Sequence, residues 1–377
     1  MNESIVVTGI GLVTPLGCSR EKTWAGVRAG LSVKDVRNAE TFSEDIAPFV
    51  RNAPFVHSNG THRIFPIALS AAHEALAHAG LSVDAVGAER LGCSVSVSKP
   101  IMNAVEREPS HPESVIEYLM EKLKLEGPAQ NIVAACATGI HSVLIASRWL
   151  QEGLCDAALA GSCESSLHPL VISGFKNLGV LSDEPRPFDK RRNGFIMGEG
   201  GGILVLERAS SAHARGVKIL AEIAGCAVGS DHGHPVKFAG DGVAVSHVIA
   251  RALEEAKINP DEVGYINYHG TGTLPNDAAE TRAVKAAFGK FAARVAASST
   301  KGSTGHLLGA SGSVELGLAC LALRDGFIPP TAGLEEPDPE CDLDYTPGRG
   351  KARDLSSALS LSFGFGGPIG AVVLKKP

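Results

Sequence analysis

The chain has 377 residues, of which 44% are hydrophobic and 20% are charged. These fractions are typical of a globular protein with enough apolar material for one large core or two joined ones, and they argue against a disordered chain. A net charge of −6 and an aromatic content of 5% argue against a nucleic-acid partner, because such binding needs positive charge for phosphates and aromatic rings for bases.

Targeting signals are the next feature to consider. The chain begins MNESIVVTGIGLV, with an acidic residue where a secretory signal would carry basic ones and without a small-residue cleavage site. The longest uncharged stretch, residues 127–147, is interrupted by polar residues and has a low mean hydropathy, so we expect no membrane span. Eight cysteines are scattered without a C-x-x-C pair, which favours a cytoplasmic setting and offers no metal-ligand spacing.

Strand-like runs alternate with segments of helical period along the chain. Strands are predicted at residues 4–11, 90–98, 131–136, 156–162, 201–207, 263–270, 294–300 and 371–376, and clear helices at 65–80 and 246–258. The first helix ends at Gly80, and Ser246 is placed to cap the second. This alternation predicts an α/β fold. A polar, glycine-rich stretch at 229–242 separates a longer half, residues 1–235, from a shorter half, residues 236–377.

A cysteine interrupts the segment NIVAACATGIHSVLIASRWLQEG at residues 131–153. The apolar run 132–135 predicts a buried central strand, and the pattern after Cys136 predicts a helix that stops near Gly153. A thiol at a helix N-terminus has a lowered pKa, and the free N–H groups there can bind an oxyanion. The alternative is a small buried residue at a tight turn, and only partner residues can decide between the two.

Two histidines follow strand-like runs and lie in glycine- and hydroxyl-rich loops. His269 belongs to NYHGTGT, whereas Lys301 and His306 belong to SSTKGSTGHLLGASGSVE, which leads into a helix containing Glu315. Loops of this kind at strand ends face a shared cleft, although each histidine alone fits a structural role equally well. A zinc site lacks the short ligand pairs it needs, and papain-like chemistry leaves the second histidine and Lys301 unexplained.

Glycine loops give weaker signals. GIGLVTPLG has Thr14 where a dinucleotide fingerprint needs its third glycine, and GEGGGILVLE precedes a strand where a phosphate site needs a helix. SFGFGGPIG combines Phe363 and Phe365 with glycines before a final strand, so its backbone N–H groups can approach a ligand closely. A β-bulge or a tight corner is the alternative for this last loop.

Taken together, VVTGIGLVTPLG, ACATGIHS, RPFDKRRNGFIMGEGGGILVLE, NYHGTGT, SSTKGSTGHLLGASGSVE and SFGFGG resemble the β-ketoacyl-acyl carrier protein synthases of the elongating type. The resemblance spans nearly the whole chain. It implies a thiolase-type layered αβαβα fold with two similar halves and mixed sheets. Two histidines distinguish the pattern from the initiating synthases and the degradative thiolases, and Cys136 distinguishes it from the chain-length-factor partners that lack the nucleophile.

The resemblance also implies roles for individual residues. Cys136 matches the nucleophile, His269 and His306 match the paired histidines, and Lys301 and Glu315 match residues that support the second histidine. Phe363, the first aromatic residue of FGFGG, matches the gate residue whose backbone N–H joins that of Cys136 in the oxyanion hole, with Phe365 beside it. The implied reaction is a decarboxylative Claisen condensation that needs no metal or redox cofactor, because acyl groups arrive on the phosphopantetheine arm of acyl carrier protein.

The implied partners are acyl carrier protein and a second subunit, as a homodimer or as a heterodimer with a chain-length-factor-like chain. Carrier proteins are acidic in this family, so we expect a local basic patch at the tunnel mouth. The cations available for it are Arg63, Arg186, Lys190, Arg191 and Arg192. An ordinary solvated charge run is the alternative for each of them.

The chain departs from the family pattern beside the gate loop and in two capping segments. Leu361 replaces an Asn, Pro368 and Ile369 replace a Thr-Asn pair, and segments 51–62 and 98–128 are shorter than is typical. Three functions therefore stand as hypotheses. They are a condensing enzyme of fatty-acid or polyketide biosynthesis, a coenzyme A-dependent thiolase-like acyltransferase, and a non-catalytic partner subunit.

Overall fold

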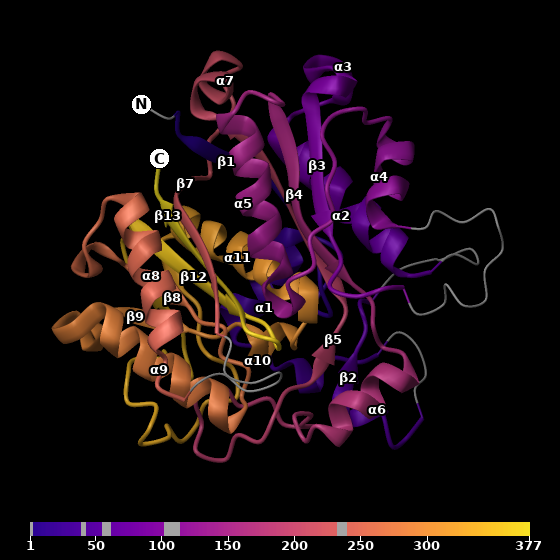
Figure 1. Ribbon diagram of the computed structural model, residues 1–377. Coiled ribbons are helices and arrows are strands. Elements are labelled where there is room, and N and C mark those ends of the chain that lie inside the picture. The colour runs from indigo at the N-terminus through magenta and orange to yellow at the C-terminus, as the bar shows by residue number, and fades with distance from the viewer. Residues whose placement is uncertain (1–2, 39–42, 55–61, 102–113, 232–239) are drawn as a thin grey trace.

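The computed structural model describes residues 3–38, 43–54, 62–101, 114–231 and 240–377 (Figure 1). Within these residues, nine strands pair in the order β3-β4-β6-β1-β7-β13-β12-β8-β9. Their bounds are β1 (Ile5–Val13), β3 (Leu91–Ser96), β4 (Ala157–Glu164), β6 (Gly200–Arg208), β7 (Ala221–Ser230), β8 (Tyr265–Asn267), β9 (Ala296–Ser298), β12 (Ser357–Phe363) and β13 (Pro368–Lys375).

The strands on the two sides of the central β1–β7 pair are arranged in the same way. β1 and β7 meet antiparallel through residues 5–7 and 221–223. From β1 the order runs β6, β4, β3, and from β7 it runs β13, β12, β8, with the outer pair parallel and the inner pairs antiparallel in both halves. The expected α/β fold with two similar halves and mixed sheets is confirmed. The boundary expected between residues 235 and 236 lies outside the described residues, and the strand order places β7 in the second half.

Two pairs of helices cover the sheet. α2 (Ile64–Ala79) packs on β1 and β6, and α8 (Val243–Ala256) packs on β7 and β13 in the same way. α5 (Thr138–Gln151) and α11 (Ser311–Asp325) contact each other and strands of both halves, so they form the layer between the halves (Figure 1). A side chain on Gly139 would collide with the backbone nitrogen of Ser313, so glycine permits this close approach.

Further helices and two small ribbons complete the described structure. The helices are α1 (Arg20–Ala29), α3 (Val83–Val86), α4 (Val115–Leu123), α6 (Pro169–Asn177), α7 (Ala209–Ala214), α9 (Leu274–Phe288) and α10 (Lys301–Thr304). Two small ribbons pair β2 (Val50–Arg51) with β5 (Met197–Gly198) and β10 (Phe327–Ile328) with β11 (Lys351–Ala352). None of the helices in the described part of the chain is both long and apolar enough to cross a membrane.

Two local predictions were wrong. The run 131–136 is not a buried strand, since its first residues are irregular and Val133 is 64% exposed. Instead, this segment lies alongside the end of β3, where the Ile132 N–H donates to Ser96 Oγ at 3.0 Å. The second helix begins at Val243 after Gly242, whose φ is 71°, and the Ser246 hydroxyl donates to the Val243 carbonyl. A short apolar run does not distinguish a buried strand from an extended edge segment.

Candidate active site

One cavity collects the residues that the motifs single out. It measures about 410 Å³ and is lined by Cys136, His269, His306, Phe363 and Phe365 together with loop residues from both halves. Cys136 precedes α5 in the first half, whereas the two histidines and both phenylalanines come from the second half. The pairing of the halves therefore creates the site.

The backbone around Cys136 is tightly held. Cys136 lies in the turn Ala135–Ala137, and Ala135 adopts a φ of 47°, in the left-handed region that alanine seldom occupies. Ser362 Oγ donates to the Cys136 carbonyl at 2.9 Å. A Cβ atom on Gly364 would lie 2.8 Å from the Ala134 carbonyl oxygen, so only glycine lets the loop after β12 lie against this turn.

The thiol of Cys136 is buried, and its pKa differs from the expectation. Burial raises the pKa to about 11, while the charges of Lys99 and Lys301 and the Phe365 N–H act in the opposite direction. The prediction of a lowered pKa at a helix N-terminus was wrong, because the loss of water around the sulfur outweighs the favourable groups. Cys136 is therefore a neutral thiol in the free protein.

The backbone N–H beside the Cys136 thiol comes from a residue two positions later in the gate loop than expected. Phe363 is the last residue of β12 and pairs with Ile369 of β13, and its ring lies 5.3 Å from the His269 ring. The backbone N–H that bonds the Cys136 thiol belongs to Phe365. The prediction that the Phe363 N–H lies beside Cys136 was wrong, since the chain leaves the strand ladder only after that residue.

His269 is held by Lys301 and Glu280, and Glu315 acts on it through Lys301. Its Nδ1 lies 3.2 Å from Lys301 Nζ, and Lys301 forms a buried ion pair with Glu315. An ammonium group can only donate, so Nδ1 accepts and the ring proton is assigned to Nε2. Glu280 accepts the backbone N–H groups of His269 at 2.7 Å and Gly270 at 2.8 Å. The prediction that Lys301 and Glu315 support the second histidine was wrong, because they reach the first.

His306 has a different supporting residue. Its Nδ1 lies 2.9 Å from Ser311 Oγ, at the start of α11, and Phe195 packs edge-on against the ring with centroids 4.7 Å apart. The two histidine rings lie 5.4 Å apart. Sequence reasoning missed Ser311 and Glu280, since a hydroxyl in a glycine-rich stretch and an acid in a helix carry no signal by themselves.

Both imidazoles are neutral in the folded protein. Burial lowers the pKa of His269 well below its usual range, and the charge of Lys301 and the nearby His306 lower it further. Burial likewise lowers the pKa of His306, with Lys301 and Lys99 adding to the effect. Two neutral N–H donors beside a thiol can stabilise negative charge on a carbonyl oxygen without giving up a proton.

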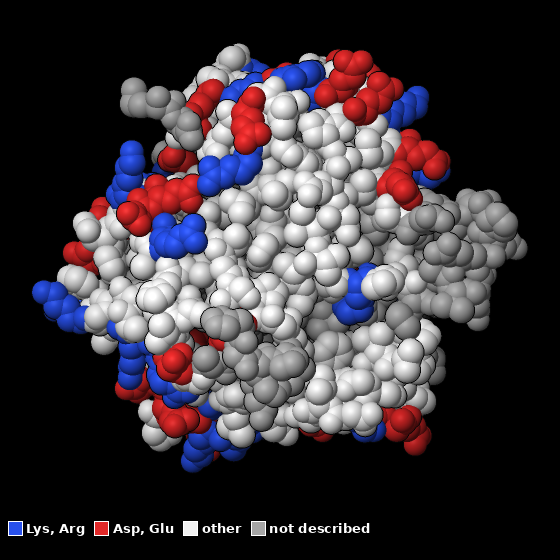
Figure 2. Space-filling view, in the orientation of Figure 1, with Lys and Arg blue, Asp and Glu red and all other residues white. Residues whose placement is uncertain are grey.

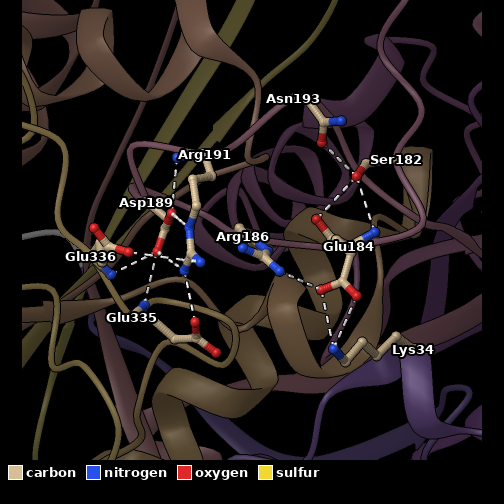
Figure 3. A network of polar contacts seen from close by, with 9 residues as sticks. All are labelled: Lys34, Ser182, Glu184, Arg186, Asp189, Arg191, Asn193, Glu335 and Glu336. Atoms are coloured by element: carbon tan, nitrogen blue, oxygen red, sulfur yellow. Dashed lines mark hydrogen bonds and ion pairs between the residues drawn. The ribbon is translucent and has the colours of Figure 1, made fainter.

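The cations proposed for carrier binding are engaged with carboxylates, and Figure 3 shows this for Arg186 and Arg191. Arg186 pairs with Glu184, Arg191 with Asp189 and Glu335, and Lys190 with Glu336. Their side chains remain partly exposed.

Arg192 and Arg63 are structural. The Arg192 side chain is 1% exposed and contacts Asp277 and Asp338, so the prediction that it meets a carrier protein was wrong. Arg63 pairs with the buried Glu199. Motif composition could not show these carboxylates, because Glu199 and Asp338 lie far away in the sequence.

Two of the three residues that depart from the family pattern beside the gate loop lie in apolar surroundings. Leu361 and Ile369 are buried in the core of the second half, and Pro368 begins β13. Among the described residues, no group of three or more His, Cys, Asp or Glu side chains is arranged to hold a metal ion.

Comparison with known proteins places this site in a family. Residues 35–212 match the N-terminal domain of β-ketoacyl synthases and residues 220–335 match the C-terminal domain. The chain is 36% identical to 3-oxoacyl-[acyl-carrier-protein] synthase 2 of Synechocystis sp., over 99% of this chain and 98% of the relative. That alignment spans 406 positions, so the relative carries residues that this chain lacks.

Solved structures of ketosynthases share the fold of this chain. A type II polyketide ketosynthase bound to a hexaketide, in complex with its acyl-carrier protein, has a TM-score of 0.90 at 30% identity, with both chains fully covered. The ishigamide ketosynthase/chain length factor has a TM-score of 0.91 at 28% identity, also with full coverage of both chains. The domain matches span most of the chain and the relatives span all of it, so this protein belongs to the β-ketoacyl synthase family.

Proposed function

We propose that this protein is an elongating β-ketoacyl-acyl carrier protein synthase. It condenses an acyl group held on Cys136 with malonyl-acyl carrier protein and releases a β-ketoacyl-acyl carrier protein two carbons longer, in fatty-acid or polyketide biosynthesis. The observation that carries the proposal is the convergence of a buried thiol and two neutral imidazoles on one cavity. The similarity to fatty-acid and polyketide synthases supports it.

The first half-reaction loads Cys136. Sγ bonds to the thioester carbonyl carbon, the bond from that carbon to the carrier sulfur breaks, and the Cys136 proton leaves with the departing thiol. Negative charge develops on the carbonyl oxygen, and the backbone N–H groups of Cys136 and Phe365 are the donors we assign to it. Contact of the Phe365 N–H with the thiol supports this assignment.

The second half-reaction uses His269 and His306. When malonyl-acyl carrier protein binds, both Nε2–H groups donate to its thioester oxygen, carbon dioxide leaves, and the resulting enolate carbon attacks the acyl carbonyl on Cys136. The tetrahedral intermediate collapses, the bond from its carbon to Sγ breaks, and the Cys136 thiolate regains its proton from solvent. Lys301 holds His269 in the tautomer with the proton on Nε2, and a hydroxyl proton donated by Ser311 would hold His306 in the same tautomer. This chemistry needs no cofactor beyond the phosphopantetheine arm.

The partners in this proposal are acyl carrier protein and a second ketosynthase-like subunit, either identical or related. The face drawn in Figure 2 supports a subunit contact, since a broad area over α5 and the neighbouring strands carries few charged side chains. Val133 and Leu154 are among the exposed large hydrophobic residues of the chain. We place the reaction in the cytoplasm, because the eight cysteines are scattered along the chain without a C-x-x-C pair, which favours a reducing setting.

Intact-mass analysis tests this function. Wild type and Cys136→Ala are incubated with acyl carrier proteins bearing chains of different length, alone and with candidate partner subunits, and malonyl-acyl carrier protein is then added. We expect only the wild type to gain an acyl mass and to return a β-ketoacyl carrier. Equal labelling of wild type and Cys136→Ala would refute the nucleophile assignment. Labelling from acyl-coenzyme A without a carrier would favour a thiolase-like acyltransferase. Absence of labelling with every donor and partner would indicate a non-catalytic subunit.

A further inference from the structure

A buried carboxylate gathers polar groups at the end of β4, outside the lining of the cavity. Glu164, with a side chain 2% exposed, accepts from Lys99 Nζ at 2.9 Å and from the Gly309 N–H at 3.2 Å. The hydroxyl groups of Ser98 and Ser166 also donate to it. Lys99 Nζ donates in addition to Ser98 Oγ at 2.7 Å, so the Lys99 ammonium group has a fixed position although its side chain is 25% exposed.

On one side, this cluster is attached to the segment that carries the nucleophile. β3 ends at Ser96, whose Oγ accepts the Ile132 N–H at 3.0 Å and the Ser142 hydroxyl of α5 at 2.7 Å. The next residue, Val97, donates its N–H to Asn131 Oδ1 at 3.1 Å. The chain that delivers Lys99 is thus bonded to the residues just before Cys136.

On the other side, the cluster is attached to the segment that carries His306. Gly309 lies in the turn Leu308–Ala310, between His306 and its partner Ser311, and this turn contacts the turn around Cys136. A Cβ atom on Gly309 would lie 2.5 Å from the Ser98 Cβ, so the cluster packs directly on this turn. Lys99 is therefore held between the segments that present Cys136 and His306.

We propose that Lys99, anchored by Glu164, is a positioning residue whose positive charge favours the Cys136 thiolate during acyl transfer. The inference rests on the proposed function, which requires the buried thiol to give up its proton. Within the described part of the chain, the charge of Lys301 also acts on the thiol, and Lys301 forms an ion pair with Glu315 beside His269.

The charges around the thiol agree with this role. Lys99 opposes the effect of burial on the Cys136 pKa more strongly than Lys301 does, while Glu164 acts against both cations. Lys99 also helps to lower the pKa of His306, so one cation favours both the thiolate and the neutral imidazole. Burial lowers the pKa of His62, in the segment before α2, whereas the charge of Glu164 raises it and that of His168 lowers it further.

The test measures the rate at which iodoacetamide alkylates Cys136 between pH 7 and 10, read by intact mass and by the peptide that carries Cys136. Lys99→Met removes the charge at similar length, Lys99→Gln keeps a hydrogen-bond donor, and Lys99→Arg keeps the charge. Lys122→Met, on the exposed face of α4, is the matched control. A melting curve for each variant separates a local effect from unfolding.

We expect Lys99→Met and Lys99→Gln to be alkylated about tenfold more slowly at pH 8, because loss of a nearby unit charge in a partly desolvated site shifts a pKa by about one unit. Lys99→Arg and Lys122→Met should stay within about twofold of wild type. Alkylation of Lys99→Met and Lys99→Gln at the wild-type rate would overturn the proposal. Alkylation of Lys99→Arg as slow as that of these two variants would overturn it as well. Alkylation needs no carrier, so failure of the condensing function would appear separately, as absence of acyl transfer.

Discussion

Replacing Lys301 by methionine removes the group that fixes the tautomer of His269. Lys301 Nζ lies 3.2 Å from His269 Nδ1, and hydrogen bonds to charged groups contribute about 1.5–3 kcal/mol. Loss of that amount in the transition state corresponds to about a 10- to 150-fold slower condensation. Acyl transfer to Cys136 should fall only about threefold, because Lys301 acts on the thiol through its charge and not through a contact.

The assay separates the two half-reactions of Lys301→Met. Intact mass follows the loading of Cys136 from acyl carrier protein, and the β-ketoacyl carrier formed after addition of malonyl-acyl carrier protein reports condensation. Lys301→Met also leaves Glu315 without its cation, at a cost of about 3–5 kcal/mol in unfolding free energy. The double variant Lys301→Met/Glu315→Gln should regain stability without regaining condensation. Equal losses in both half-reactions, or recovery of condensation in the double variant, would refute the reasoning.

Three further predictions concern other parts of the site. Ser311→Ala removes a neutral hydrogen bond from His306 and should slow condensation about threefold to tenfold, with loading of the nucleophile unchanged by the same mass assay. Burial lowers the pKa of His269 and His306 below that of unfolded chains, so each histidine should lower the unfolding free energy as pH drops below about 6.5, by up to about 1.4 kcal/mol per unit. Burial raises the pKa of Glu280 to about 8 and that of Glu315 to about 7, so these carboxyl groups act in the opposite direction over the same range. Urea midpoints of wild type and His269→Asn at pH 7, 6 and 5 isolate the histidine contribution, and the same pH dependence in both proteins would contradict it. Arg192→Met leaves Asp277 without its buried cation and should lower the melting temperature, while the KM for carrier protein stays unchanged in variants that remain folded.

The sequence predicts the identity of the reacting groups better than their pairings. Cys136, His269 and His306 lie in motifs whose loops converge, because strand ends and helix starts meet at the same edge of the fold. Lys301 lies closer in sequence to His306 than to His269, yet its side chain reaches the first histidine from the start of α10. Such a choice depends on side-chain direction, which motif spacing does not contain.

Local chemistry explains the other differences. The run before Cys136 has the apolar composition of a central strand, but it lies along the end of β3 with Val133 exposed. The cations of RPFDKRRNG are visible in the sequence, whereas Glu335 and Glu336, which pair with Arg191 and Lys190, arrive from a loop more than 140 residues later. Charge runs therefore predict a docking patch only when the rest of the fold leaves them unpaired.

Peptide mapping of the acyl-enzyme tests the central claim most directly. After incubation with acyl carrier protein, the acyl mass should reside on the peptide that contains Cys136, and addition of malonyl-acyl carrier protein should remove it while a β-ketoacyl chain two carbons longer forms on the carrier. An acyl mass on any other peptide, or an acyl group on Cys136 that malonyl-acyl carrier protein does not discharge, would contradict the account.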